Sequence, residues 1–189
     1  MSTGWILAAV AAAIAVYLIV VFNRLVRQRN VVREGWSGID VQLKRRTDLV
    51  PNLVETVKGY AAHERSLFEE IASRRAASVA ASDVGGQANA ERALSGSLGK
   101  LMAVAEAYPD LKANQNFLEL QKQLSVTEDN IQMARRYYNG AVRNLNISIQ
   151  SFPDVIVARM LGFREEPFFE LESRAEGAAP QIGFPGGKA

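Results

Sequence analysis

The chain has 189 residues, with 22 Lys and Arg against 20 Asp and Glu and a formal net charge of +2 at pH 7. This length fits a single domain. The lack of cysteine excludes a disulfide scaffold, a thiolate metal site and a cysteine nucleophile. The single histidine, His63, excludes a His-rich zinc site, and the small net charge predicts no nucleic-acid partner.

The first predicted element is an apolar helix at the N-terminus. No charged side chain precedes Arg24, and Trp5–Phe22 is a continuous run of 18 apolar residues. A helix of this length spans about 27 Å, close to the hydrocarbon core of a bilayer at about 30 Å. We expect a retained transmembrane anchor over residues 1–23. The alternatives are a buried core helix and a cleaved signal peptide, which would carry a basic residue before the run.

The charges that flank this run predict its orientation. Basic residues follow it and none precedes it, so the positive-inside rule places the N-terminus outside and the rest of the chain in the cytoplasm. The residues expected to hold the anchor in the bilayer are Trp5, Phe22, Arg24 and Arg27.

From residue 24 to about 150 the apolar pattern is helical. The first stripe continues from the apolar run to Arg46, and Pro51 is expected to end this helix at Val50. The expected elements after it are a helix over 51–81, a loop over 82–86, a helix that carries Leu94 to Tyr108, a helix over 113–150, a short amphipathic helical region over 153–172 and a mobile tail over 173–189.

These elements predict an all-α fold. Short loops imply antiparallel neighbours, so we expect a transmembrane helix that continues into an antiparallel up-down four-helix bundle over 24–152. One conflict appears in the lengths. Residues 24–47 would span about 36 Å and residues 113–150 about 55 Å, so the first helix bends, the bundle leans, or the end of the first helix is wrong.

Three blocks carry a resemblance to a known family. They are NVVREGWSGIDVQLKRRTDLVPNLVETVKGYAAHE at residues 30–64, EAYPDLKANQNFL at 106–118 and EDNIQMARRYYNGAVRNLNISIQSFP at 128–153. Together they resemble the LemA family, in order and over nearly the whole chain. The resemblance implies a small bacterial membrane protein with a soluble helical domain, here in the inner membrane. It implies no enzymatic activity.

Charged residues on the apolar seams predict a buried polar layer. Arg46 lies on the first seam, and Glu64 shares a face with Val57 and Ile71. Glu128 and Arg135 flank the seam of the long fourth helix at the same heptad position. Buried charges are costly unless they are paired, so we expect these four residues to pair across the core and fix the register of the helices.

Two turns are expected at the end of the bundle far from the membrane. Their residues are Arg45, Asp48, Pro51 and Asn52 in the first turn, and Tyr108, Pro109, Asp110 and Lys112 in the second. Capping and turn chemistry explains them, and a docking surface for a partner is the alternative. The apolar segment Val155–Phe163 returns towards the bilayer, where it lies in the interface or packs against the bundle.

The functional hypothesis is a non-enzymatic scaffold that acts by self-association or by docking a membrane-protein partner. It needs the lipid bilayer and predicts a homo-oligomer, with no cofactor and no metal. The first alternative is a single-pass sensor or receptor with an extracytoplasmic bundle, and the second is an oligomer that shapes membranes. A carboxylate enzyme at Glu64 or Glu106 is the third, although no H-E-x-x-H motif is present.

Overall fold

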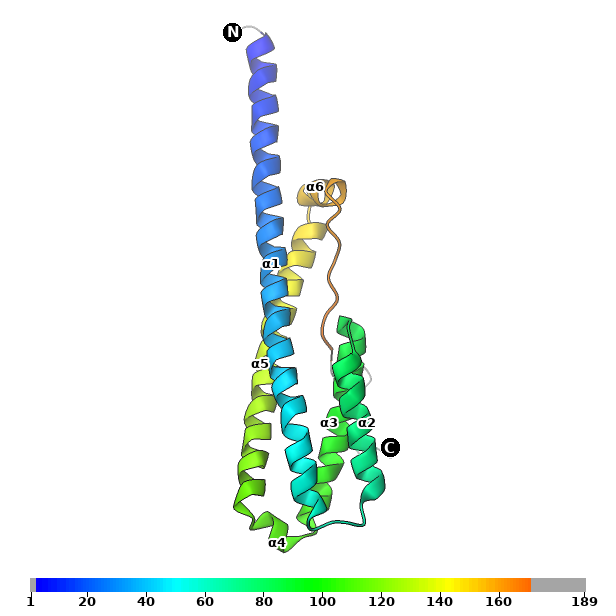
Figure 1. The fold of residues 1–189 in the computed structure, drawn as a ribbon. Helices are drawn as coiled ribbons and strands as arrows, with labels where there is room; N and C mark the ends of the chain where they lie inside the picture. Colours follow the sequence, from blue (N-terminus) through cyan, green and yellow to red (C-terminus); the bar gives the residue numbers. More distant parts are fainter. Residues whose placement is uncertain (1–2, 171–189) are drawn as a thin grey trace, which may run out of the picture.

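The computed structural model describes residues 3–170, and these form six helices without a strand. The helices are α1 (Thr3–Lys58), α2 (Arg65–Ala80), α3 (Val84–Glu106), α4 (Pro109–Lys112), α5 (Gln115–Gln150) and α6 (Asp154–Met160). The prediction of an all-α fold is confirmed. Figure 1 shows α1 and α5 side by side as a long pair, with the α2–α3 hairpin packed against the half of α1 far from the N-terminus.

The first helix is longer than the sequence pattern predicts. The prediction that Pro51 ends it is wrong, because α1 continues through Pro51 to Lys58. A proline cannot donate to the carbonyl four residues before it, here that of Thr47. The Nε of Arg75 in α2 donates to this oxygen at 2.7 Å, so the carbonyl still has a partner. The turn to α2 therefore lies at residues 59–64 and not at 47–52.

This longer helix removes the conflict in lengths. The 35 residues from Arg24 to Lys58 span about 52 Å, and the 36 residues of α5 span about 54 Å. The conflict came from the predicted end of the first helix. With α1 ending at Lys58, the two helices have similar lengths without a bend in α1 or a leaning bundle.

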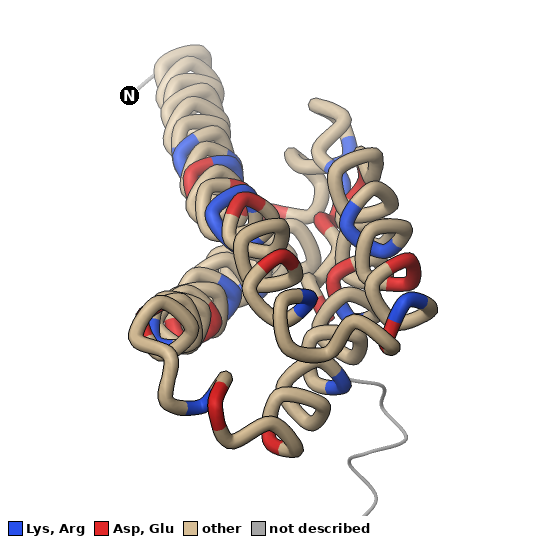
Figure 2. The backbone as a smooth tube through the Cα atoms, turned by 60° about the horizontal axis from the view of Figure 1, so that its bottom comes forward, with Lys and Arg blue, Asp and Glu red and all other residues tan. Residues whose placement is uncertain are grey.

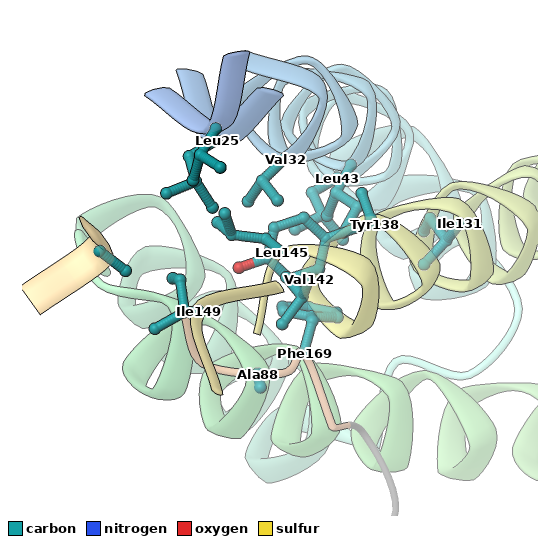
Figure 3. Packing of buried hydrophobic residues seen from close by; sticks show 14 of the residues in the cluster. Leu25, Val32, Leu43, Ala88, Ile131, Tyr138, Val142, Leu145, Ile149 and Phe169 are labelled. Atoms are coloured by element: carbon teal, nitrogen blue, oxygen red, sulfur yellow. The ribbon is translucent and has the colours of Figure 1, made fainter. Parts of the chain in front are cut away.

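Two apolar cores hold the helices together. In the first, shown in Figure 3, α1 places Leu25, Val32 and Leu43 against residues of α5 that include Tyr138 and Leu145. The second lies at the other end, where the last turns of α1 pack with α2, α3 and the start of α5. The four-helix part is thus confined to the distal half, and the half near the apolar run is built mainly on the α1–α5 pair.

Local capping explains the remaining boundaries. Asp83 accepts a hydrogen bond from the backbone of Gly86 at 2.8 Å, so α3 begins at Val84 and the predicted loop over 82–86 is shorter. Asn114 caps α5 in the same way through the backbone of Phe117 at 3.1 Å.

The region over 153–172 differs from the prediction. Of its described residues, 153–170, only Asp154–Met160 are helical, and those that follow α6 run back along the bundle as an extended segment to the buried Phe169 (Figure 1). The side chain of Asn146 pairs with the backbone of Glu166, and that of Asn139 pairs with the backbone of Phe169. The tail predicted over 173–189 lies outside the described residues.

Candidate functional site

A buried ion pair lies where four helices meet. Arg46 of α1 and Glu91 of α3 are both fully buried and form a salt bridge. The Nη1 atom of Arg46 also donates to Glu128 Oε1 of α5 at 2.8 Å and to Ser95 Oγ of α3 at 2.8 Å. One guanidinium group therefore joins α1, α3 and α5.

The carboxylate of Glu91 extends this network to α2. Ser78 Oγ of α2 donates to Glu91 Oε1, and Gln87 Nε2 donates to the same oxygen at 2.7 Å. Gln87 also donates to the backbone carbonyl of Ser78 at 3.2 Å. Each buried charge thus has an opposite charge and neutral hydrogen-bond partners, which offset the cost of its desolvation. The network fixes how the α2–α3 hairpin sits against the α1–α5 pair.

The structure brings together two of the four residues expected in the polar layer. Arg46 meets Glu128, but Glu64 is the residue before α2, at the far end of the bundle. Arg135 lies half-buried on α5, and no described hydrogen bond or ion pair joins it to Arg46 or Glu91. Glu64 is displaced because α1 runs through Pro51 and moves the following turn along the chain.

Glu91 is the residue that sequence reasoning missed. The apolar stripe of α3, followed back from Leu94 by three residues at a time, passes through Glu91 to Ala88. The signal that selected Arg46, a charged residue on an apolar seam, was therefore present at Glu91 as well.

The distal end is formed by two turns that contact each other. Asn114 Nδ2 donates to the hydroxyl of Tyr60 at 3.1 Å and so joins the 59–64 turn to the turn that precedes α5. The residues of the second predicted turn are here, in and beside α4: Tyr108, Pro109, Asp110 and Lys112. Those of the first predicted turn, Arg45, Asp48, Pro51 and Asn52, lie inside α1, so that assignment is wrong.

A surface cavity of about 330 Å³ lies between α1 and α2, next to the buried network. Its charged lining residues are Asp40, Lys44, Asp48 and Arg75, two acids and two bases. No group of three or more His, Cys, Asp or Glu residues is placed to hold a metal ion in the described part of the chain. The cavity offers a mixed polar and apolar surface, and its lining contains no histidine or cysteine that could serve as a base or nucleophile.

Two groups in the bundle titrate away from their usual range. Burial, and then the negative charge of Glu166, raises the pKa of Tyr138 to about 12, and its hydroxyl donates to the carbonyl of Pro167 at 2.9 Å. Hydrogen bonds from Lys100 and Ser97 lower the pKa of the partly buried Glu70. Neither group lies in the cavity, so these shifts reflect local packing and pairing and give no sign of a catalytic acid or base.

At the other end of the molecule, α1 projects beyond the bundle. Its most apolar stretch has a mean hydropathy of 2.7, only 6% of it is buried, and it is long and apolar enough to cross a membrane. Figure 2 shows that the first turns of α1 carry no charged residue. Trp5 is 75% exposed at the start of the span and Phe22 is half-exposed near its end, followed by Arg24 and Arg27.

The end of the span is tied to α6. The hydroxyl of Tyr17 donates to Asp154 Oδ1 at 2.8 Å, and Arg24 forms a salt bridge with the same carboxylate. The rings of Phe22 and Phe163 lie 6.2 Å apart, edge to face. These contacts set where α6 lies along α1.

Comparison with known proteins identifies the family. The LemA family model matches residues 35–184, from the middle of α1 past the end of α6. The chain belongs to the LemA family. This LemA-family chain is 28% identical to magnetosome protein MamQ 2 of Paramagnetospirillum magneticum over an alignment of 179 positions, which covers 81% of the chain and 66% of that relative. It therefore spans slightly less than two thirds of that relative's length.

Two further relatives agree with this assignment. Magnetosome protein MamQ of Magnetospirillum gryphiswaldense is 26% identical over 178 residues, covering 80% of the chain and 65% of that protein. Protein LemA of Metamycoplasma hominis is 27% identical over 150 residues, covering 78% of the chain and 68% of that protein. None of these names denotes an enzyme. The chain is thus a LemA-family protein with an N-terminal helix of membrane-spanning length and composition.

Proposed function

We propose that this LemA-family protein is a non-enzymatic scaffold of the bacterial inner membrane that acts by self-association. In this proposal residues 1–23 span the bilayer, the N-terminus is outside and the bundle is in the cytoplasm. The observation that carries it is the continuity of α1, which passes from the apolar span into the bundle as one helix. A flexible linker would let the bundle tumble, whereas a continuous helix holds it at a set distance and direction from the membrane.

The charges next to the span support the orientation. Arg24, Arg27, Arg29 and Arg33 follow the apolar run within three turns, and no Lys or Arg precedes it. Anionic lipids of the cytoplasmic leaflet would also attract this basic segment.

An exposed apolar stripe on α5 supports self-association. Val126, Met133 and Ile147 are about half-exposed, and they are separated by one and two heptads, with Gly140 at the position between. Seven-residue spacing keeps side chains on one face of a helix, as in the seam of a coiled coil. The occupant that we propose for this stripe is the α5 helix of a second copy, and a membrane-protein partner is the alternative.

Topology is tested by cysteine labelling, since the chain has no cysteine of its own. Thr3→Cys and Ser66→Cys are labelled in intact cells with a maleimide that cannot cross membranes. The proposal expects labelling at position 3 in intact cells and at position 66 only after the cells are opened. Labelling of intact cells at position 66 alone would show the opposite orientation and favour the receptor with an extracytoplasmic bundle.

Self-association is tested by the size of the particle purified in mild detergent. The proposal expects an oligomer that Met133→Lys dissociates, while Val79→Lys, at a somewhat more exposed site on α2, leaves it intact. A wild-type particle with the mass of one chain, or equal effects of the two substitutions, would overturn the proposed contact.

A further inference from the structure

The bend before α6 exposes one large apolar side chain, and α6 exposes two more on one face. Phe152 is 82% exposed, Ile156 52% and Met160 74%, and these three follow one another at four-residue spacing. Leu161 extends the patch with 51% exposure. The opposite face, with Asp154, Val157 and Ala158, is buried against the bundle. Such a cluster on so short a helix indicates contact with another apolar phase.

The position of α6 along α1 is fixed by contacts from several residues. Tyr17 and Arg24 both bind the carboxylate of Asp154, and Phe22 contacts Phe163. The helix therefore lies at the level of residues 17–24 of α1. Figure 1 shows that α6 lies crosswise to α1, at the end of α5. A helix that lies across a membrane-spanning helix is parallel to the membrane surface.

The length of the free part of α1 places this level inside the bilayer. Residues 3–16 are exposed, and these 14 residues span about 21 Å. The bonds from α1 to α6 are made further along, by Tyr17 and Arg24. The hydrocarbon core of a bilayer is about 30 Å thick. The apolar run continues over Tyr17 to Phe22, where α6 packs, and these six residues supply about 9 Å more. If α1 is tilted, each of its residues spans less of the membrane thickness, so more of the hydrocarbon core lies at the level of α6.

The charges around α6 match a membrane interface. Arg159 of α6 is exposed, and so are Arg164 and Glu165 just after it, on the same end of the molecule as Arg24 and Arg27. The only acidic residue within α6, Asp154, is neutralised by Arg24 and hydrogen-bonded to Tyr17. An apolar face flanked by arginine is typical of a helix that lies in the interface of an anionic leaflet, with its apolar side about 5–10 Å deep.

We infer that α6 is a second membrane contact, in which Phe152, Ile156, Met160 and Leu161 insert into the leaflet from which α1 emerges. The inference rests on the proposed membrane anchoring of α1 and holds for either orientation of the chain. A single spanning helix can rotate and tilt freely. A second contact beside it fixes the direction in which the bundle, and with it the α5 stripe, faces along the membrane plane.

The test uses the full chain in bilayers of phosphatidylethanolamine and phosphatidylglycerol. Nitroxide labels are placed at Met160→Cys and, in a second variant, at Ile156→Cys. Collisions with oxygen, which concentrates in lipid, are compared with collisions with a water-soluble nickel chelate. Ile14→Cys, in the apolar span, is the lipid reference, and Val79→Cys, exposed on α2, is the water reference. Helix content by circular dichroism checks that each labelled variant is folded.

We expect the oxygen-to-nickel collision ratio at positions 160 and 156 to be several-fold higher than at 79 and to approach that at 14. Ratios at 160 and 156 equal to that at 79, with a lipid-like ratio at 14, would overturn the inference and leave the anchor intact. A water-like ratio at position 14 would instead overturn the proposal that α1 spans the membrane. Low collision with both reagents at 160 and 156 would show that protein covers α6, which also overturns the inference.

Discussion

Arg75 of α2 donates a hydrogen bond of 2.7 Å to the carbonyl oxygen of Thr47 in α1, the oxygen that Pro51 leaves without a helical donor. The side chain of one helix thus completes the backbone of another. This contact explains how a proline is accommodated inside a helix that sequence rules would end there.

Arg75→Leu should lower the free energy of unfolding by about 1–3 kcal/mol, because the buried Thr47 carbonyl loses its donor. In a Pro51→Ala background the new N–H at position 51 can pair with this carbonyl, so the same substitution should cost much less. Denaturant unfolding in mild detergent, followed by circular dichroism, measures both. Equal costs in the two backgrounds would disprove the coupling between Arg75 and Pro51.

Arg46→Met should lower the free energy of unfolding by about 3–5 kcal/mol, because it leaves the buried charge of Glu91 without its partner. Adding Glu91→Met removes that charge and should recover much of the loss. The control is Arg45→Met, at an exposed site next in sequence, with an expected change within about 0.5 kcal/mol. A double variant no more stable than Arg46→Met alone would contradict the view that the unpaired charge of Glu91 causes the loss.

Gly35→Leu should destabilise the α1–α5 pair. A Cβ at position 35 would lie 3.1 Å from the Cα of Tyr138 and 3.2 Å from the ring of Tyr137, so a larger side chain must push the helices apart. Overpacking of this kind costs about 1–3 kcal/mol. Gly38→Leu, one turn away with open space around it, should instead gain up to about 1 kcal/mol from helix propensity. The two melting temperatures should therefore move in opposite directions; a shift in the same direction would contradict this account.

Alkaline pH should destabilise the fold through Tyr138. Its pKa is raised from 10.0 to about 12, so the folded state holds the proton more tightly than the unfolded state. The contribution of Tyr138 to the free energy of unfolding is fully present below pH 10. It is lost between pH 10 and about 12, where this tyrosine ionises in the unfolded chain but not yet in the folded one. Titration of tyrosinate absorbance should show a last step near pH 12 that Tyr138→Phe abolishes and Tyr137→Phe leaves in place. If the step persists in Tyr138→Phe, it belongs to another tyrosine and the assignment to Tyr138 is wrong.

Local signals in the sequence were sufficient for several elements. The apolar run before Arg24 identifies the span, and the long apolar stripe predicted over 113–150 gives α5, Gln115–Gln150, to within two residues. These features depend on neighbours in the chain: a cap, a proline or a repeat of three and four residues.

The sequence by itself determined that this protein is helical, where its apolar span lies and that Arg46 falls on an apolar seam. Only the tertiary structure decided that Pro51 stays within α1, that Glu91 is the buried partner of Arg46 and that α6 lies beside Tyr17. Each of these depends on groups that are far apart in the chain. A helix pattern records which face of a segment is buried, but it does not record which distant side chain will supply a missing donor or an opposite charge.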